Sequence, residues 1–194
     1  MKKEIKTTSA NELDNMLRGI YGRTLKDILV AGYIDTLDSV KQFHPMFEDI
    51  YFDFDGIIIR ASSIQQFWYL GLEVIDKIDC RFELEDDDEF AVCSLNFMLA
   101  FPSGPNIFRN LVAFIAPDEL IDSGNIVCAA LEFDCGDATL AREVIFLNPR
   151  NEFGIHLGTH AALENWRCQN ALAVTLLVER TFPESIAGTF TIGS

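Results

Sequence analysis

The sequence is poor in basic residues: 15 lysines and arginines stand against 30 aspartates and glutamates in 194 residues, a net charge of −15 at pH 7. A chain with so little positive charge repels the phosphates of nucleic acids and anionic lipids. The acidic excess is concentrated in residues 45–95, which carry 13 acidic and 3 basic side chains. We therefore expect no nucleic-acid partner and favour a basic protein partner, with association that slows as salt is added.

The sequence also lacks long apolar runs and paired cysteines. No stretch approaches the roughly 18–20 apolar residues that a membrane span needs, and no apolar segment of a secretory signal follows the charged residues 1–6. Five cysteines are widely spaced and never form a C-x-x-C pair, which favours free thiols in a reduced compartment. We expect a cytoplasmic protein with no membrane contact and no cofactor.

What the chain has in abundance is apolar and aromatic residues: 49% of it is hydrophobic and 16 residues are phenylalanine. This composition is typical of a packed core, and the length suits one domain spanning residues 1–194. Residues 1–44 have a helical pattern and residues 48–194 are mainly strands. The predicted fold class is α+β, with N-terminal helices, a largely antiparallel sheet of about seven or eight strands, and a late helix near 160–170.

The helical pattern of the first segment divides into three pieces. Ser9–Glu12 form a capping box, and apolar residues then recur at helical spacing up to Ile20. A second helix is predicted to begin at Thr24, and a third is capped by Asp35 and ended by Pro45. Apolar segments between turn-like residues predict the later strands, namely Leu70–Ile78, Val92–Ala100, Ile107–Ala116, Asn125–Phe133, Arg142–Leu147 and Ala171–Thr181.

The clearest local signal is a hairpin within residues 51–60. Asp55-Gly56 is the preferred centre of a two-residue type I′ turn, because both central positions need a positive φ. A turn at these two residues places Phe54 opposite Ile57 and, two residues further back, Phe52 opposite Ile59.

The same string, Ile50–Gly56, also resembles the first motif of the haloacid-dehalogenase-like phosphatases, an apolar strand ending in D-x-D-G. The resemblance implies that Asp53 is a nucleophile and Asp55 a general acid. It also implies Mg²⁺ held by Asp53 and a later acidic residue, for which Asp137 is the candidate. Ile57 stands where that family usually has threonine, and the hairpin and phosphatase interpretations both remain open.

Two further segments carry candidate partner-binding residues. The first is an acidic run, predicted to be a solvated loop between two strands or a patch that attracts cations; its carboxylates are Glu83, Glu85, Asp86, Asp87, Asp88 and Glu89. The second is the aromatic triplet 67–69, where no basic residue is interleaved and nucleic-acid stacking is disfavoured. Trp68 is predicted to pack in the core or, if exposed, to anchor an interface.

These features favour a non-enzymatic binding protein whose acidic face docks a basic partner. In composition and size the chain resembles bacterial immunity proteins, the antidotes that cover the active site of a toxin such as a nuclease. In that hypothesis the acidic run, with Asp53 and Asp55, occupies a cationic groove meant for phosphate. The alternative is a Mg²⁺-dependent phosphatase using Asp53 and Asp55. A third possibility is a module that pairs with another copy of itself, and acidity that serves only solubility stays open as well.

Overall fold

Among the described residues, an N-terminal helix is followed by a long series of strands, a pair of late helices and a final strand. The computed structural model describes residues 10–37, 40–96, 105–116, 126–135, 143–174 and 177–183. Its elements are α1 (Ala10–Ile20), β1 (Thr24–Leu25), β2 (Asp27–Asp35), β3 (Phe43–Phe54), β4 (Ile57–Ile64), β5 (Tyr69–Ile75), β6 (Asp88–Ser94), β7 (Asn106–Ile115), β8 (Ile126–Cys135), β9 (Glu143–Asn148), β10 (His156–Gly158), α3 (His160–Gln169), α4 (Ala171–Val174) and β11 (Val178–Phe182).

All the strands belong to one antiparallel sheet. Its main path runs β1-β7-β8-β5-β4-β3-β2-β6, while β11 adds to β7, β9 adds to β8 and β10 adds to β9. The α+β class with a mainly antiparallel sheet is therefore confirmed. The predicted number of strands was too small, because the described residues alone form 11 strands of this sheet.

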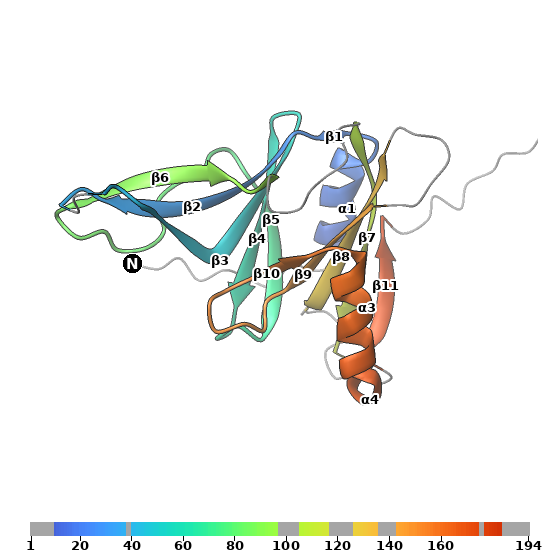
Figure 1. Ribbon diagram of the computed structural model, residues 1–194. Helices are drawn as coiled ribbons and strands as arrows, with labels where there is room; N and C mark the ends of the chain where they lie inside the picture. The colour runs from blue at the N-terminus through green and yellow to red at the C-terminus, as the bar shows by residue number, and fades with distance from the viewer. Residues whose placement is uncertain are drawn as a thin grey trace, which may run out of the picture.

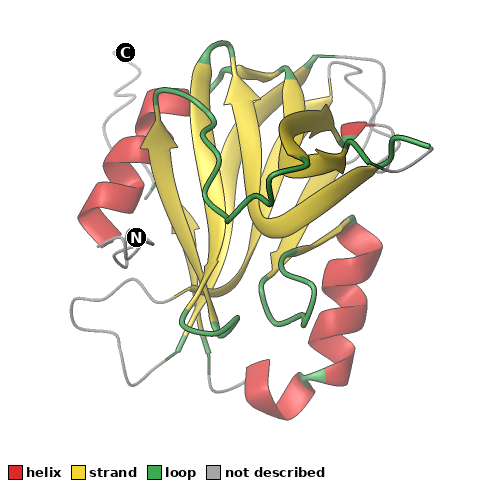
Figure 2. Cartoon of the chain, turned by 90° about the vertical axis from the view of Figure 1, so that its left-hand side faces the viewer, coloured by secondary structure: helices red, strands yellow, loops and turns green. Residues whose placement is uncertain are grey.

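Helices lie on both faces of the β7–β8–β9 part of the sheet (Figures 1 and 2). The main core lies on one of these faces. There Leu13, Leu17 and Ile20 of α1 are buried together with apolar residues of β2–β5. α3 covers the opposite face, where Leu163 and Trp166 pack against apolar residues of β7, β8 and β9. No helix within the described ranges is long and apolar enough to span a membrane.

Three phenylalanines join the two halves of the main core, one half on β2–β5 and the other on β7–β9. Phe54 at the end of β3 lies with its ring centroid 5.6 Å from that of Phe108 on β7 and 6.4 Å from that of Phe133 on β8. All three side chains are fully buried. Because β3 has no backbone hydrogen bonds to β7 or β8, side-chain packing of this kind holds these strands together.

The hairpin prediction is confirmed. Asp55 and Gly56 have φ values of 54° and 87°, as a type I′ turn requires. The β3–β4 register pairs Phe54 with Ile57 and continues without a shift to the pair of Asp49 and Ser62.

The second and third predicted helices are wrong. Thr24–Leu25 and Asp27–Asp35 are strands, and Pro45 lies within β3 opposite Gly32. Ile28 and Val30, two residues apart, are both fully buried, so burial over the first half of β2 follows the period of a strand. Helical spacing is ambiguous in so short an apolar run, and the tertiary pairing decides between the two.

The remaining predicted elements are shifted rather than absent. The late helix is confirmed as α3, which begins at His160. Residues 171–174 form the short helix α4 instead of a strand, so the last strand is only β11. Of the strand expected at Val92–Ala100, residues 92–94 belong to β6, which begins earlier at Asp88, inside the acidic run. Residues 97–100 of that prediction lie outside the described residues.

Strands β2, β3 and β6 extend beyond the rest of the sheet as an arm, which we define as residues 32–35, 43–47 and 88–92 (Figure 1). β2 and β3 come very close at the base of the arm: a Cβ on Gly32 would lie 2.2 Å from the carbonyl oxygen of His44. Their pairing also shifts register between Val30 and Gly32. A glycine and an irregularity at this point allow the arm to bend away from the body.

Candidate acidic interface

The acidic run lies on the segment that connects β5 to β6. These two strands are not neighbours, because β4, β3 and β2 lie between them in the sheet. Residues 76–87 therefore cross the face of these strands that points away from the main core, which we call the outer face. The crossing ends where β6 begins, at the tip of the arm.

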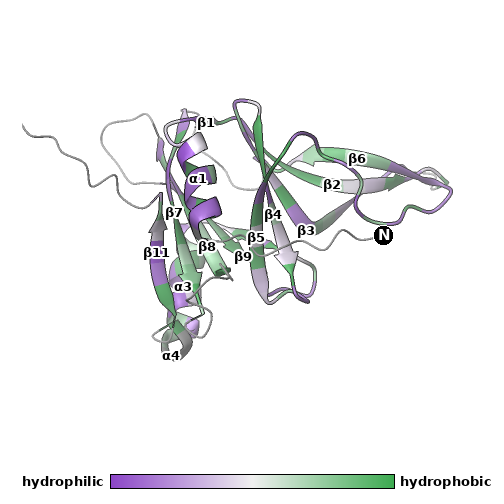
Figure 3. Ribbon diagram, turned by 180° about the vertical axis from the view of Figure 1, so that it is seen from behind, coloured by the Kyte–Doolittle hydropathy of each residue, from purple (hydrophilic) through white to green (hydrophobic). Residues whose placement is uncertain are grey.

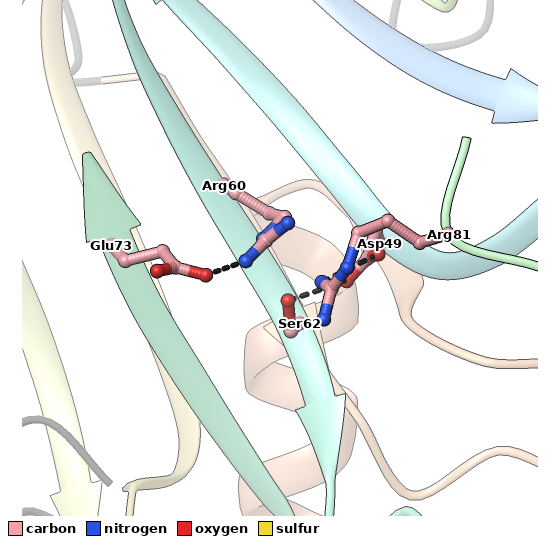
Figure 4. Close-up of polar contacts among 5 residues, drawn as sticks. All are labelled: Asp49, Arg60, Ser62, Glu73 and Arg81. Atoms are coloured by element: carbon pink, nitrogen blue, oxygen red, sulfur yellow. Dashed lines mark hydrogen bonds and ion pairs between the residues drawn. The ribbon is translucent and has the colours of Figure 1, made fainter. Parts of the chain in front are cut away.

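An ion pair anchors the middle of the crossing segment to the outer face (Figure 4). Arg81 Nη1 donates to both carboxylate oxygens of Asp49 on β3, at 3.0 and 3.3 Å. The hydroxyl of Ser62 on β4, a buried residue, donates to the same carboxylate. The side chains of Asp49 and Arg81 are only 14% and 23% exposed, so this pair is much less screened by solvent than a surface ion pair.

A second polar pair lies beside the anchor on the same face. Arg60 on β4 forms an ion pair with Glu73 on β5 (Figure 4) and lies opposite Tyr51 on β3. Burial, and then the nearby carboxylate of Asp49, raise the pKa of the Tyr51 phenol to about 12. Burial and the neighbouring charge of Arg81 lower the pKa of Arg60. At neutral pH the tyrosine is therefore uncharged inside this polar layer.

Aromatic rings hold the next residue of the crossing segment, Phe82, against the arm. Phe82 lies 6.4 Å from Tyr33 on β2 and 6.2 Å from Phe90 on β6, measured between ring centroids. Tyr33 is in turn stacked on His44 of β3 at 4.9 Å. The acidic run therefore begins directly after two fixed points, Arg81 and Phe82.

The carboxylates that follow project from the tip of the arm. Glu83, Glu85, Asp86 and Glu89 are exposed, and Asp87 and Asp88 are half-buried. Figure 3 shows the hydrophilic colour of this end of the arm. The sequence prediction of a solvated segment fits residues 83–87, whereas Asp88 and Glu89 belong to β6.

Backbone contacts fix the shape of this tip. The carbonyl oxygen of Asp87 accepts hydrogen bonds from the backbone N–H and the hydroxyl of Thr36, at 2.9 and 2.6 Å. The carboxylate of Asp88 accepts the N–H of Glu85 at 3.0 Å. Asp88 also lies opposite Asp35 on β2. Like charges opposite each other destabilise a strand pair, so a cation that approaches the tip relieves repulsion there.

A small pocket lies next to the anchor. It has a volume of about 20 Å³ and is lined by Ala31, Met46, Glu48, Asp49, Tyr51, Arg81 and Phe82. That volume suits one water molecule, whereas pockets for small ligands are about 300–1,000 Å³. This pocket is therefore too small for a ligand larger than water.

The structure does not bring Asp53 and Asp55 to the acidic tip. Asp53 pairs with Asp27 at one end of β2, and the acidic run meets Asp35 at the other end. At about 3.3 Å per residue, these two ends lie about 25 Å apart. The two groups cannot act together on one small site.

Asp53 and Asp55 have local structural partners. The carboxylate of Asp53 accepts the N–H of Gly56 at 2.7 Å, and Asp55 lies 3.2 Å from the ammonium group of Lys26. Asp137, the residue expected to share Mg²⁺ with Asp53, lies outside the described residues. Among the described residues no group of three histidine, cysteine or acidic side chains could hold a metal ion. The phosphatase alternative stays a prediction that these contacts do not support.

Trp68 is exposed, at 55%, in the turn between β4 and β5. The guanidinium carbon of Arg150 lies over its ring, 4.8 Å from the ring centroid. The three residues that directly precede Trp68 have positive φ values: 50° at Gln65, 58° at Gln66 and 68° at Phe67. The exposure expected of an interface anchor is therefore present, on a turn separate from the acidic run.

Sequence reasoning missed the anchor of the acidic segment. The confirmed turn at Asp55-Gly56 implies the pair of Asp49 and Ser62 by counting back along the register, so the contact between these two residues could have been predicted. Nothing in the sequence near Arg81 indicates that it meets Asp49, 32 residues away.

The anchor leads to a prediction about stability. Arg81→Ala leaves the half-buried carboxylate of Asp49 without its counter-charge, and we expect the free energy of unfolding to fall by about 2 kcal/mol. Lys77→Ala is the matched control, because it removes another cation of the same segment, one that is 77% exposed and paired with Asp79. We expect it to change stability by less than about 0.5 kcal/mol. Urea unfolding gives both values, and equal effects would contradict the anchoring role of Arg81.

No known family model matches this chain, and no curated protein or solved structure matches it.

Proposed function

We propose that this protein is a non-enzymatic binding protein that docks a basic protein partner through the acidic tip of the arm. The observation that carries the proposal is the exposure of Glu83, Glu85, Asp86 and Glu89 on a segment fixed by the Arg81–Asp49 ion pair. A fixed array of carboxylates loses little conformational entropy when it meets a cationic surface.

Electrostatics supports the same proposal. The tip concentrates part of the chain's net charge of −15 in one place, and this local charge attracts basic surfaces over a distance and speeds their encounter. In its more specific form the proposal is that of an antidote, in which these carboxylates occupy a groove that would otherwise bind phosphate. This form would apply to a toxin such as a nuclease in the same cytoplasm.

The first experiment identifies the partner. Tagged protein is mixed with lysate of the source cell at low and at high salt, and bound proteins are identified by mass spectrometry. We expect one stoichiometric basic protein whose recovery falls at high salt. The antidote form further requires that the isolated partner has a toxic activity, such as nuclease activity, which the protein inhibits.

A pair of charge-matched variants then locates the site. The tip variant changes Glu83, Glu85 and Glu89 to Gln and Asp86 to Asn; the control changes Glu143, Glu152, Glu164 and Glu179 to Gln. Both lose the same four charges, but only the first loses the tip. We expect the tip variant to associate with the partner at least about tenfold more slowly, and the control to stay within about twofold. Equal slowing would mean that net charge alone acts, and the proposal would fail.

A further inference from the structure

The open edge of β6 is the second feature of the arm that suits a partner. β6 is the last strand of the sheet path and pairs on one side only, with β2, among the described residues. An open strand edge carries N–H and C=O groups that can hydrogen-bond to another extended chain.

Two backbone hydrogen bonds establish which groups of β6 point to the open edge. Leu95 N–H donates to the carbonyl of Ile28 at 2.7 Å, and Thr36 N–H donates to that of Asp87 at 2.9 Å. In an antiparallel pair the residues that bond to the partner strand alternate. Counting by twos along the β2–β6 register, the residues of β6 that face β2 are therefore Glu89, Ala91 and Cys93.

The residues between them face away from β2. Phe90 and Val92 direct both their N–H and their C=O groups to the open edge, and no described residue bonds to them there. The N–H of Asp88 already donates to the carbonyl of Glu85. The part of the edge that can pair with an added strand therefore begins at the carbonyl of Asp88. This is enough backbone to pair with a short added strand of about four or five residues.

The side chains along this edge indicate the chemistry of the added strand. Glu89 is exposed and Asp88 half-buried at the beginning of β6, and Val92 is 38% exposed further along. A fitting strand has lysine or arginine beside Glu89 and, on its other face, an apolar residue beside Val92. A second copy of this chain fits poorly, because it would bring another net charge of −15 and another acidic tip.

We propose that the edge of β6 accepts an extended, cationic segment of the partner as an added β-strand. This proposal rests on the proposed function, because it assigns the way in which the basic partner is held after its charge has brought it to the tip. The carboxylates would set the speed of encounter, and the backbone groups of Phe90 and Val92 would set the lifetime of the complex.

The test uses an eight-residue peptide of alternating valine and lysine as the probe, with a valine–glutamate peptide of the same length as its control. Amide resonances of the ¹⁵N-labelled full chain are followed by NMR while peptide is added. We expect the lysine peptide to shift the Phe90 and Val92 amides and to slow their hydrogen exchange, and the glutamate peptide to do neither.

A proline variant separates backbone pairing from charge. Val92→Pro removes an N–H that faces the open edge and leaves the β2 pairing intact, which is where proline is tolerated in a sheet. Val92→Ala, the control, keeps that N–H. We expect Val92→Pro to weaken peptide binding about tenfold and Val92→Ala by less than about threefold.

The other outcomes are distinct. Shifts confined to residues 83–87, with Phe90 and Val92 unchanged, would overturn strand addition while leaving the acidic docking of the proposed function in place. Lack of any shift at low salt would overturn both proposals. Resonances of β6 that change with protein concentration alone would show that a second copy pairs with the edge, and the proposal would be replaced.

Discussion

Gly154→Ala is expected to lower the free energy of unfolding by about 3 kcal/mol or more, because two separate effects act at this position. Gly154 has a φ of +106°, which side-chain-bearing residues rarely adopt. A Cβ there would also lie 2.3 Å from the carbonyl carbon and oxygen of Phe47 on β3. The contact that holds the segment, in which Ile155 N–H donates to the carbonyl of Phe47 at 2.6 Å, would have to break.

Two other glycines separate these effects. Gly56 has a φ of +87° but open space around its Cβ position, so Gly56→Ala tests backbone conformation alone and is expected to cost about 1 kcal/mol. Gly19 lies in α1 with open space and no positive φ, and Gly19→Ala is expected to stabilise by about 0.5–1 kcal/mol. Thermal and urea unfolding of the three variants give the order. A cost at Gly154 no greater than that at Gly56 would show that the close approach to Phe47 does not matter.

Phe54→Ala is expected to lower the free energy of unfolding by about 3–5 kcal/mol. Phe54 is fully buried and contacts the rings of Phe108 and Phe133, so its removal leaves a cavity where β3 meets β7 and β8. No backbone hydrogen bond joins β3 to those strands, and the lost contacts have no substitute there.

Phe153→Ala is the matched control for this prediction. It removes the same side chain from a site that is 74% exposed, and we expect a change below about 0.5 kcal/mol. Urea unfolding with both variants measures the difference. A small effect of Phe54→Ala would mean that the two halves of the core are held independently of this aromatic contact.

The proposals for the arm do not depend on these stability effects. Glu83, Glu85, Asp86 and Glu89 are solvent-exposed and Val92 is 38% exposed, so changes at these positions are expected to alter binding with little effect on the core. Binding and stability measurements on the same variants therefore distinguish a damaged fold from a lost interface.

The sequence by itself determined the features that depend on neighbouring residues. Asp55-Gly56 specified a type I′ turn because few other residues accept a positive φ at both positions, and that turn fixed the β3–β4 register as far as Asp49 and Ser62. The late helix and the solvated character of residues 83–87 followed equally from local pattern and charge.

Only the tertiary structure decided the features that join distant segments. Residues 27–35 carry apolar spacing that suits either a helix or a strand, and pairing with β3 and β6 made them a strand. The same long-range pairing put β6 at the sheet edge. The segment before β6 therefore crosses the outer face, where Arg81 meets Asp49, and the acidic run that follows Arg81 lies far from Asp53. Local sequence contains no information about such contacts, because their stability comes from side chains far apart in the chain and from strand order.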